Sequence, residues 1–207
     1  AAHTSLCMGP IMAFGTEEQK MKWIPDLASG RKIGAFGLTE PGAGTDASGQ
    51  QTTAVKDGDD WILNGSKCFI TNGDTASTYT VLAVTDRAKG YRGMTMFVVE
   101  KGMPGFSTVV HEKKMGIRGS STTDLIFEDV RVPDANRLGK VGQGWQVVMH
   151  TLNGARAGVA AQALGIGEGA LDLAMKYVQE RMQFKKKLSK FQRTQFEIAD
   201  MHTKLEA

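Results

Sequence analysis

The stretch Phe36-Gly-Leu-Thr-Glu-Pro-Gly-Ala-Gly-Thr-Asp-Ala-Ser48 carries the first of two patterns that decide the fold. An apolar run ends inside it and gives way to glycine, proline, threonine and carboxylate residues. The pattern predicts a strand that enters a loop, in which Gly42 and Gly44 can adopt positive φ and let the backbone approach a ligand closely. Thr39 and Thr45 add hydroxyl groups at the mouth of this loop.

The second pattern, Asn64-Gly-Ser-Lys-Cys-Phe-Ile-Thr-Asn-Gly73, begins and ends with a dipeptide that is typical of turns. The pairs Asn64-Gly65 and Asn72-Gly73 predict two turns, and Lys67 to Thr71 between them predicts a short strand. Either pattern alone also fits an ordinary hairpin with a glycine-rich turn. Their occurrence together in one chain is stronger evidence than either pattern alone.

Composition permits many functions and excludes a few. The chain has 207 residues, of which 41% are hydrophobic and 23% charged, as in an ordinary soluble globular protein. The net charge of +3 is too small for a nucleic-acid footprint, and the one basic cluster, Lys185 to Lys187, fits a solvated surface. No apolar run reaches the length that a membrane helix needs.

The cysteines and histidines predict neither a disulfide nor a metal site. Cys7 and Cys68 lie far apart among apolar neighbours, which indicates free, buried thiols in a reducing compartment. The histidines have no spacing that would bring two of them onto one helix face. They are His3, His111, His150 and His202.

Hydrophobic periodicity divides the chain into three parts and predicts an α+β fold. Residues 1 to about 30 are helical in pattern, with Thr16 as a helix N-cap. Short β-rich runs without intervening helices follow and predict an antiparallel barrel or sandwich. Beyond Gly144 the pattern predicts two long, substantially buried helices, the second from near Ser189. The predicted strands are Ile33–Leu38, Thr52–Lys56, Trp61–Leu63, Lys67–Thr71, Thr78–Thr85, Met94–Glu100, Phe106–Val110 and Leu125–Val132.

These segments together resemble the acyl-CoA dehydrogenase family, and most closely its short-chain, butyryl-CoA type. The resemblance covers nearly the whole chain, because further motifs follow in the family's order. They are Phe14-Gly-Thr-Glu-Glu-Gln-Lys20 with Trp23 and Pro25, Lys114-Met-Gly-Ile-Arg-Gly-Ser-Ser121, Phe127-Glu-Asp-Val-Arg-Val-Pro133 and Arg181-Met-Gln-Phe184.

The resemblance implies three domain segments and missing ends. Residues 1–32 match the end of an N-terminal helical domain, 33–137 a middle β domain that holds flavin and substrate, and 138–207 the start of a C-terminal helical domain. Family members carry further helices at both ends, so the chain reads as an internal excerpt. A targeting segment would lie outside it.

The resemblance implies FAD as cofactor and assigns residues to it. In this family a carboxylate takes the proton α to the thioester, and the β-hydrogen leaves as hydride to the flavin. The implied flavin contacts within the middle segment are Phe36, Leu38, Thr39, Thr45, Phe69, Ile70 and Thr71. Those that reach the flavin of a neighbouring subunit are Arg181, Phe184 and Gln192. The implied acyl-CoA contacts are Thr45, Asn153, Gly154 and Arg156, although Arg156 equally fits a structural ion pair.

Two positions depart from the family pattern. Some members carry the catalytic glutamate where this chain has Ala155, and the others carry it on a loop further downstream. Glu168 and Glu180 fit helix-surface carboxylates, so the sequence predicts no catalytic residue within the chain. Lys185 to Lys187 replace a common glycine and proline, which would let that turn straighten or shift and weakens the assignments of Arg181 and Gln192.

The implied function is α,β-desaturation of short- to medium-chain acyl-CoA thioesters in fatty acid β-oxidation, a part of lipid metabolism. Electrons would pass to an electron-transfer flavoprotein, and the flavin contacts across subunits imply a homo-oligomer, typically a tetramer. The compartment would be the bacterial cytoplasm or the mitochondrial matrix. Alternatives are an oxidase, a CoA-dependent enoyl reductase of the same family, or a flavin-free, non-catalytic scaffold subunit. An absorbance spectrum of the full-length protein without a flavin signal would favour the scaffold subunit.

Overall fold

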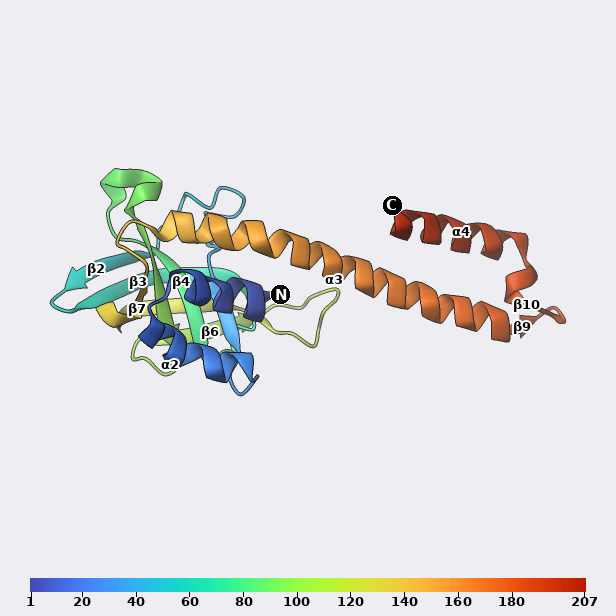
Figure 1. Ribbon diagram of the computed structural model, residues 1–207, viewed down its shortest axis with the longest axis horizontal. Helices are drawn as coiled ribbons and strands as arrows, with labels where there is room; N and C mark the ends of the chain where they lie inside the picture. The colour runs from blue at the N-terminus through green and yellow to red at the C-terminus, as the bar shows by residue number, and fades with distance from the viewer. The chain divides into compact units, whose positions relative to one another are not determined.

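The computed structural model describes the backbone of residues 1–207 and every side chain except those of Val110 and His111. The chain forms two compact units, which we call the sheet unit (Ala1–Ala155) and the helical unit (Arg156–Ala207). Helix α3 (Gly144–Glu180) contributes residues to both of them. Figure 1 shows the order of the elements along the chain.

The sheet unit begins with helices whose boundaries follow local sequence signals. A π-helical segment, η1 (Ala2–Met8), leads into α1 (Gly9–Phe14) and α2 (Glu17–Ala28). The predicted N-cap is confirmed, because the Thr16 side chain accepts the Gln19 N–H and the Gln19 side chain accepts the Thr16 N–H. This reciprocal capping satisfies backbone donors that the first helical turn leaves unpaired.

The eight strands of the sheet unit form one mixed sheet. Their order is β6-β7-β3-β2-β4-β5-β8, with β1 paired to β4 beside this path. The α+β class is confirmed, and the sheet is sandwich-like and does not close into a barrel. The strands are β1 (Gly34–Gly37), β2 (Thr53–Asp57), β3 (Asp60–Thr71), β4 (Thr78–Val84), β5 (Met94–Glu100), β6 (Phe106–His111), β7 (Thr122–Pro133) and β8 (Arg137–Leu138).

The sheet departs from the predicted antiparallel arrangement at β1. This strand runs parallel to β4, from the pair Gly34↔Thr78 to the pair Gly37↔Val81, and β2 touches β4 in the same sense. Parallel neighbours need a long connection that leaves the sheet edge and returns. Here the connection contains the whole β2–β3 hairpin, and periodicity within β1 cannot reveal which partner the strand finds.

The predicted turn at Asn64-Gly65 is also wrong. Strand β3 continues through it, and Gly65 (φ 141°) lies where the register against β7 shifts by one residue. A Cβ on Gly65 would lie 2.7 Å from the Thr52 Cα, so glycine here permits a close approach of two backbone segments. The turn before β3 instead contains Gly58 (φ 58°).

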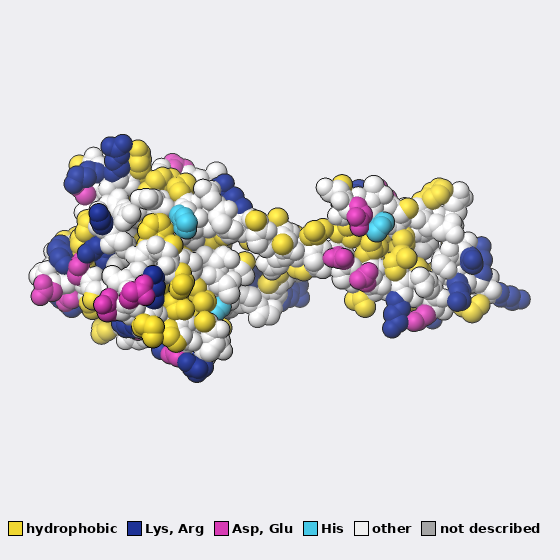
Figure 2. Space-filling model, viewed as in Figure 1, with side chains coloured by type: hydrophobic (Ala, Val, Ile, Leu, Met, Phe, Trp, Pro, Cys, Tyr) yellow, Lys and Arg dark blue, Asp and Glu magenta, His cyan; other side chains and the backbone are white. Residues whose placement is uncertain are grey.

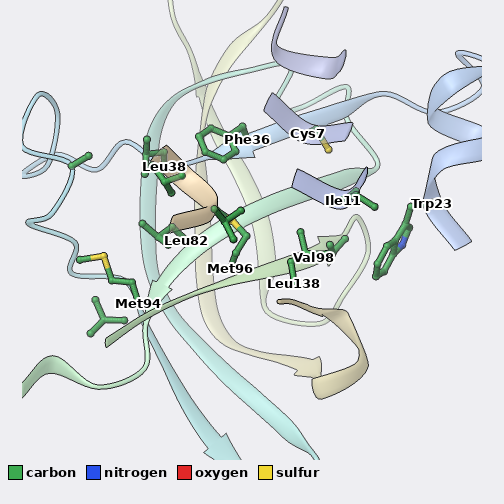
Figure 3. Close-up of a cluster of buried hydrophobic side chains, with 14 of the residues drawn as sticks. Cys7, Ile11, Trp23, Phe36, Leu38, Leu82, Met94, Met96, Val98 and Leu138 are labelled. Atoms are coloured by element: carbon green, nitrogen blue, oxygen red, sulfur yellow. The ribbon is translucent and has the colours of Figure 1, made fainter. Parts of the chain in front are cut away.

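Period-2 alternation along the strands separates two hydrophobic clusters. In β5, Met94, Met96 and Val98 face the helices, whereas Phe97 and Val99 face the second cluster inside the sandwich-like sheet. Figure 3 shows the first cluster, in which side chains from η1, α1 and α2 meet β1, β4, β5 and β8. Val147 and Val148 of α3 complete it. The predicted free, buried thiols of Cys7 and Cys68 are confirmed.

The helical unit contains the rest of α3 and a second helix, α4 (Gln192–Glu206). A short hairpin, β9 (Met182–Gln183) with β10 (Lys186–Lys187), joins them through a short helical turn, η4 (Leu188–Lys190). The two long helices were predicted, but their predicted burial is wrong for this unit. Figure 2 shows apolar side chains on its surface. Examples are Val159, Ile166, Leu173, Tyr177 and Phe196, which are 51%, 59%, 72%, 56% and 64% exposed.

Within the described residues, no helix combines the length and the apolar character that crossing a bilayer requires.

Candidate functional site

The loop that follows β1 is held in shape by the side chain and backbone of Glu40. Its backbone forms a two-way bridge with Ala43, with N–H···O distances of 3.1 and 3.0 Å. Its carboxylate accepts the N–H of Gln51 at 2.6 Å and that of Thr52 at 3.1 Å. The glutamate therefore closes the loop by binding its far end. We call this closed loop, residues 38–52, the arch.

The carboxylate of Glu40 is also paired with a buried cation from β3. Lys67 Nζ lies 2.7 Å from Glu40 Oε1, and the two side chains are 0% and 3% exposed. Burial lowers the pKa of Lys67 to about 8, and the charge of Glu40 opposes this effect. Burial acts to raise the pKa of Glu40, but the charge and hydrogen bond of Lys67 outweigh it and bring the pKa below its usual value. The 2.7 Å contact between Lys67 Nζ and Glu40 Oε1 stabilises the charged form of each group.

A β-bulge re-aims the next residues of β3. The register against β7 shifts between Lys67 and Ile70, and Phe69 between them has φ 58°, a left-handed conformation that is rare for an aromatic residue. Its side chain is 62% exposed. Strained residues of this kind persist only where the surrounding structure holds them, and they are concentrated at functional sites. Here the holding bonds are Cys68 N–H to Thr39 O at 2.9 Å and Phe69 N–H to Asp124 Oδ1 at 3.3 Å.

The bulge and the loop therefore meet, and they bring several of the predicted flavin contacts together. Thr39 is half-buried and lies next to the bulge through the Cys68 hydrogen bond. The side chains of Phe69 and Thr71 are exposed on the same strand segment, and Thr45 is exposed in the loop. An open aromatic ring with hydroxyl groups beside it suits a flat ligand that has polar edges.

Three other predicted flavin contacts have their side chains in the core. Phe36 and Leu38 are 8% and 9% exposed and belong to the cluster drawn in Figure 3, and Ile70 is 3% exposed in the second cluster. The contribution of these residues to the site is thus mainly the packing that fixes the neighbouring backbone.

The glycines of the loop differ from prediction in one respect. Neither Gly42 nor Gly44 has a positive φ in the structure. A Cβ placed on either would meet no atom within 4 Å, so these positions face open space. The two glycines therefore provide a backbone that a ligand can approach, and they do not form a left-handed turn.

The predicted acyl-CoA contacts on α3 alternate with buried residues of the same helix. Asn153 and Gly154 are exposed, whereas Ala155 is 5% exposed and Thr151 4%. Arg156 is exposed, and no ion pair of its guanidinium occurs among the described side chains. Ala155 presents only a methyl group where some relatives of the resembled family carry a carboxylate. Glu168 and Glu180 are exposed on α3 in the helical unit, as predicted for surface carboxylates.

The remaining predicted contacts lie in the helical unit and are all exposed: Arg181, Phe184 and Gln192. The lysine-rich segment does not straighten. Phe184 (φ 50°) and Lys185 (φ 61°) form the two-residue turn of the β9–β10 hairpin, although neither is a glycine. Lys186 Nζ lies 4.1 Å from the centre of the Phe191 ring, a cation–π contact that helps to hold this turn.

Sequence reasoning missed the roles of Lys67 and Gln50. Lys67 Nζ also donates to Gln50 Oε1 at 2.5 Å, and Gln50 is 2% exposed. A signal was present, because Trp61, Leu63 and Lys67 occupy alternate positions of β3 and the first two face the core. A lysine on the buried face of a strand needs an acidic partner, and the loop offered Glu40.

A glycine-rich arch bonded to a bulged strand, with helices on one face of the sheet, defines a protein of the sheet-and-helix class. Family models agree with this description. Residues 1–31 match the acyl-CoA dehydrogenase N-terminal domain, 35–130 its middle domain and 142–207 its C-terminal domain. The chain belongs to the acyl-CoA dehydrogenase family.

Individual relatives are similar over all of this chain. The short-chain specific acyl-CoA dehydrogenase of Clostridium acetobutylicum is 54% identical over 100% of this chain and 55% of its own length. The chain thus spans about half the length of the curated relatives that it matches.

Solved structures give the same result. Butyryl-CoA dehydrogenase from Megasphaera elsdenii is 55% identical with a TM-score of 0.94, over 99% of this chain and 54% of that one. A chain solved in work on the electron transferring flavoprotein of Acidaminococcus fermentans is 60% identical with a TM-score of 0.96, over 99% and 54%. A glutaryl-CoA dehydrogenase from Mycobacterium smegmatis in complex with FADH2 is 41% identical with a TM-score of 0.89, over 97% and 50%.

Proposed function

We propose that this chain is the flavin-binding part of an FAD-dependent acyl-CoA dehydrogenase. One observation carries the proposal: the arch lies against the bulged part of β3. The contact is the hydrogen bond of 2.9 Å from Cys68 N–H to Thr39 O, and Phe69 to Thr71 follow directly after Cys68. This arrangement fits FAD, because the ring of Phe69 and the side chain of Thr71 are exposed on β3, and the loop glycines Gly42 and Gly44 face open space. A relative with the same fold is described with FADH2 bound.

The proposed residue roles follow from this placement. Thr39 and Thr71 hydrogen-bond the polar edge of the ring system, Phe69 covers one of its faces, and Phe36, Leu38 and Ile70 hold the backbone behind it. FAD, when bound, supplies the acceptor for a hydride from the β-carbon of the substrate. Thr45 contributes to binding of both FAD and acyl-CoA.

The proposed substrate is a short- to medium-chain acyl-CoA thioester, which becomes unsaturated between its α- and β-carbons. Similarity to the short-chain and butyryl-CoA enzymes supports this choice. Asn153, Gly154 and Arg156 present polar groups on the exposed side of α3 for the CoA portion. A carboxylate from outside residues 1–207 takes the α-proton, because Ala155 has no group that can accept it.

The proposed partners are an electron-transfer flavoprotein and further copies of the chain. Similarity to a chain solved in work on such a flavoprotein supports the first. Exposed Arg181, Phe184 and Gln192, together with the apolar surface of the helical unit, support a homo-oligomer, a tetramer in the finer form of the proposal. The compartment would be the bacterial cytoplasm or the mitochondrial matrix.

The test replaces the hydroxyl of Thr71 in the full-length protein. Thr71→Val keeps the volume of the side chain but removes a hydrogen bond worth about 1–2 kcal/mol, so flavin affinity and the rate of flavin reduction by butyryl-CoA should fall about tenfold. The matched control is Thr108→Val, on the outer strand β6, which should change neither quantity. Both are measured by the visible absorbance of the flavin in titration and stopped-flow experiments.

Two results would contradict the proposal. A wild-type protein that binds no flavin would favour the scaffold alternative. Flavin bound normally in Thr71→Val would show that this threonine has no part in the site.

A further inference from the structure

Lys67 directs every donor of its ammonium group to one segment of the chain. Nζ lies 2.7 Å from Glu40 Oε1, 2.5 Å from Gln50 Oε1 and 3.4 Å from the carbonyl oxygen of Leu38. A lysine ammonium has three N–H donors, so its bonding capacity is used entirely within residues 38–50. The side chain comes from β3 and is fully buried, and it therefore joins that strand to the arch in front of it.

The acceptors of Lys67 are themselves tied to the ends of the arch. Glu40 also accepts the N–H groups of Gln51 and Thr52, and the Gln50 side chain donates to Ala47 O at 3.1 Å. Removing the ammonium would leave Glu40 as an unpaired, buried carboxylate at the point where the arch closes. The ammonium of Lys67 therefore adds a buried side-chain link between the arch and β3 to the backbone bond from Cys68 N–H to Thr39 O.

Stability alone does not explain such a pair. A buried ion pair gains little over well-packed apolar residues of the same volume, because both charges lose their hydration, and some proteins retain such pairs to specify one conformation. In this chain the pair lies between two segments whose spacing matters. Thr39 stands between Leu38 and Glu40, and the bulged residues of β3 follow directly after Lys67.

We propose that Lys67 and Glu40 are a positioning pair that fixes Thr39 at the correct distance from Phe69 and Thr71, so that all three reach one bound flavin. The inference rests on the proposed function. Neither charged group touches the ligand in this arrangement, because Glu40 is 4% and Lys67 0% exposed. Cys68, the residue after Lys67 on β3, adds a second link, because its N–H donates to Thr39 O.

The test is a set of variants of the full-length protein: Lys67→Met, Glu40→Gln and the double variant. Each single variant leaves a buried partner without its counter-charge, so both the melting temperature and flavin affinity should fall. In the double variant no buried charge remains, and the melting temperature of the flavin-free protein should recover. Flavin affinity should stay at least about tenfold below that of the wild type, and the visible spectrum of the bound flavin should stay shifted.

This separation of the two readouts distinguishes positioning from a merely structural role. If the pair only stabilised the fold, flavin affinity would recover together with the melting temperature. The matched control is Lys22→Met, which removes an ion pair of similar length (Lys22 Nζ to Glu100 Oε1, 2.7 Å) on a part-exposed surface and should leave both readouts unchanged.

A milder variant covers the case in which Lys67→Met does not fold. Gln50→Leu removes one acceptor and keeps the ion pair, and it should lower flavin affinity about threefold or more. Wild-type flavin affinity and spectrum in either the double variant or Gln50→Leu would overturn the inference while leaving the proposed function intact. A wild-type protein without flavin would overturn the proposed function, and the inference with it.

Discussion

The sheet unit and the helical unit have similar apolar side chains but bury them to very different extents. In the sheet unit, Tyr79 and Phe97 are fully buried, whereas in the helical unit Leu173 and Phe196 are 72% and 64% exposed. Strands that alternate residues between two faces enclose two clusters at once. Two helices can cover only a stripe of each other. Hydrophobicity in the sequence therefore shows which side chains need burial, while the fold decides where burial happens.

The largest expected effect contrasts a buried with an exposed phenylalanine. Phe127 is 2% exposed and its ring stacks on that of Phe106 at 5.2 Å, so Phe127→Ala should lower the free energy of unfolding by about 3–5 kcal/mol. Phe196→Ala should cost less than about 0.5 kcal/mol in an unassembled subunit, where its side chain is 64% exposed. Urea unfolding followed by far-ultraviolet circular dichroism measures both. A cost above about 2 kcal/mol for Phe196→Ala would mean that α4 is covered in the full-length protein, and the contrast would disappear.

A second pair of variants should change stability in opposite directions. A Cβ on Gly93 would lie 1.7 Å from Asp86 O, which cannot move without disturbing the backbone, so Gly93→Ala should cost about 1–3 kcal/mol. A Cβ on Gly165 in α3 would meet no atom within 4 Å, and Gly165→Ala should add about 0.5–1 kcal/mol by favouring the helix. Thermal unfolding compares the two. Destabilisation by Gly165→Ala would reveal a close neighbour of α3 in the complete protein.

The smallest effect concerns acid sensitivity in the sheet unit. Hydrogen bonds from Arg137 and Trp61 hold the pKa of Asp134 well below its ordinary value of 3.8. A lowered pKa stabilises the fold above the unfolded-state value, and this contribution is lost as the pH falls below about 3.8 toward the folded-state pKa. It should be on the order of 1 kcal/mol or less, because the Asp134 side chain is 37% exposed.

Two variants check this assignment. Asp134→Asn and Arg137→Gln should both flatten the fall in urea midpoint between pH 5 and pH 2.5, since each removes one side of the same interaction. If the wild type and both variants lose stability equally over that range, the acid sensitivity belongs to other carboxylates.

Local sequence patterns predicted most elements of the fold because their causes are local. The cap at Thr16 needs only Gln19, three residues away. The β-rich runs predicted β4 and β5 to within a residue. Burial of α3 and α4 could not be predicted in the same way, because it depends on what lies against them.

The sequence by itself determined the α+β class, the segments that could form the ligand site, and the threonines, glycines and aromatic residues within them. The tertiary structure decided that β1 runs parallel to β4, that Asn64-Gly65 is a register shift rather than a turn, and that Phe69 is turned outward by a bulge. It also decided that Lys67 pairs with Glu40, 27 positions earlier. These features arise from contacts between residues distant in the chain, which become neighbours only when the sheet assembles. A local pattern can show that Lys67 lies on a buried face of β3, but it does not place the partner beside it.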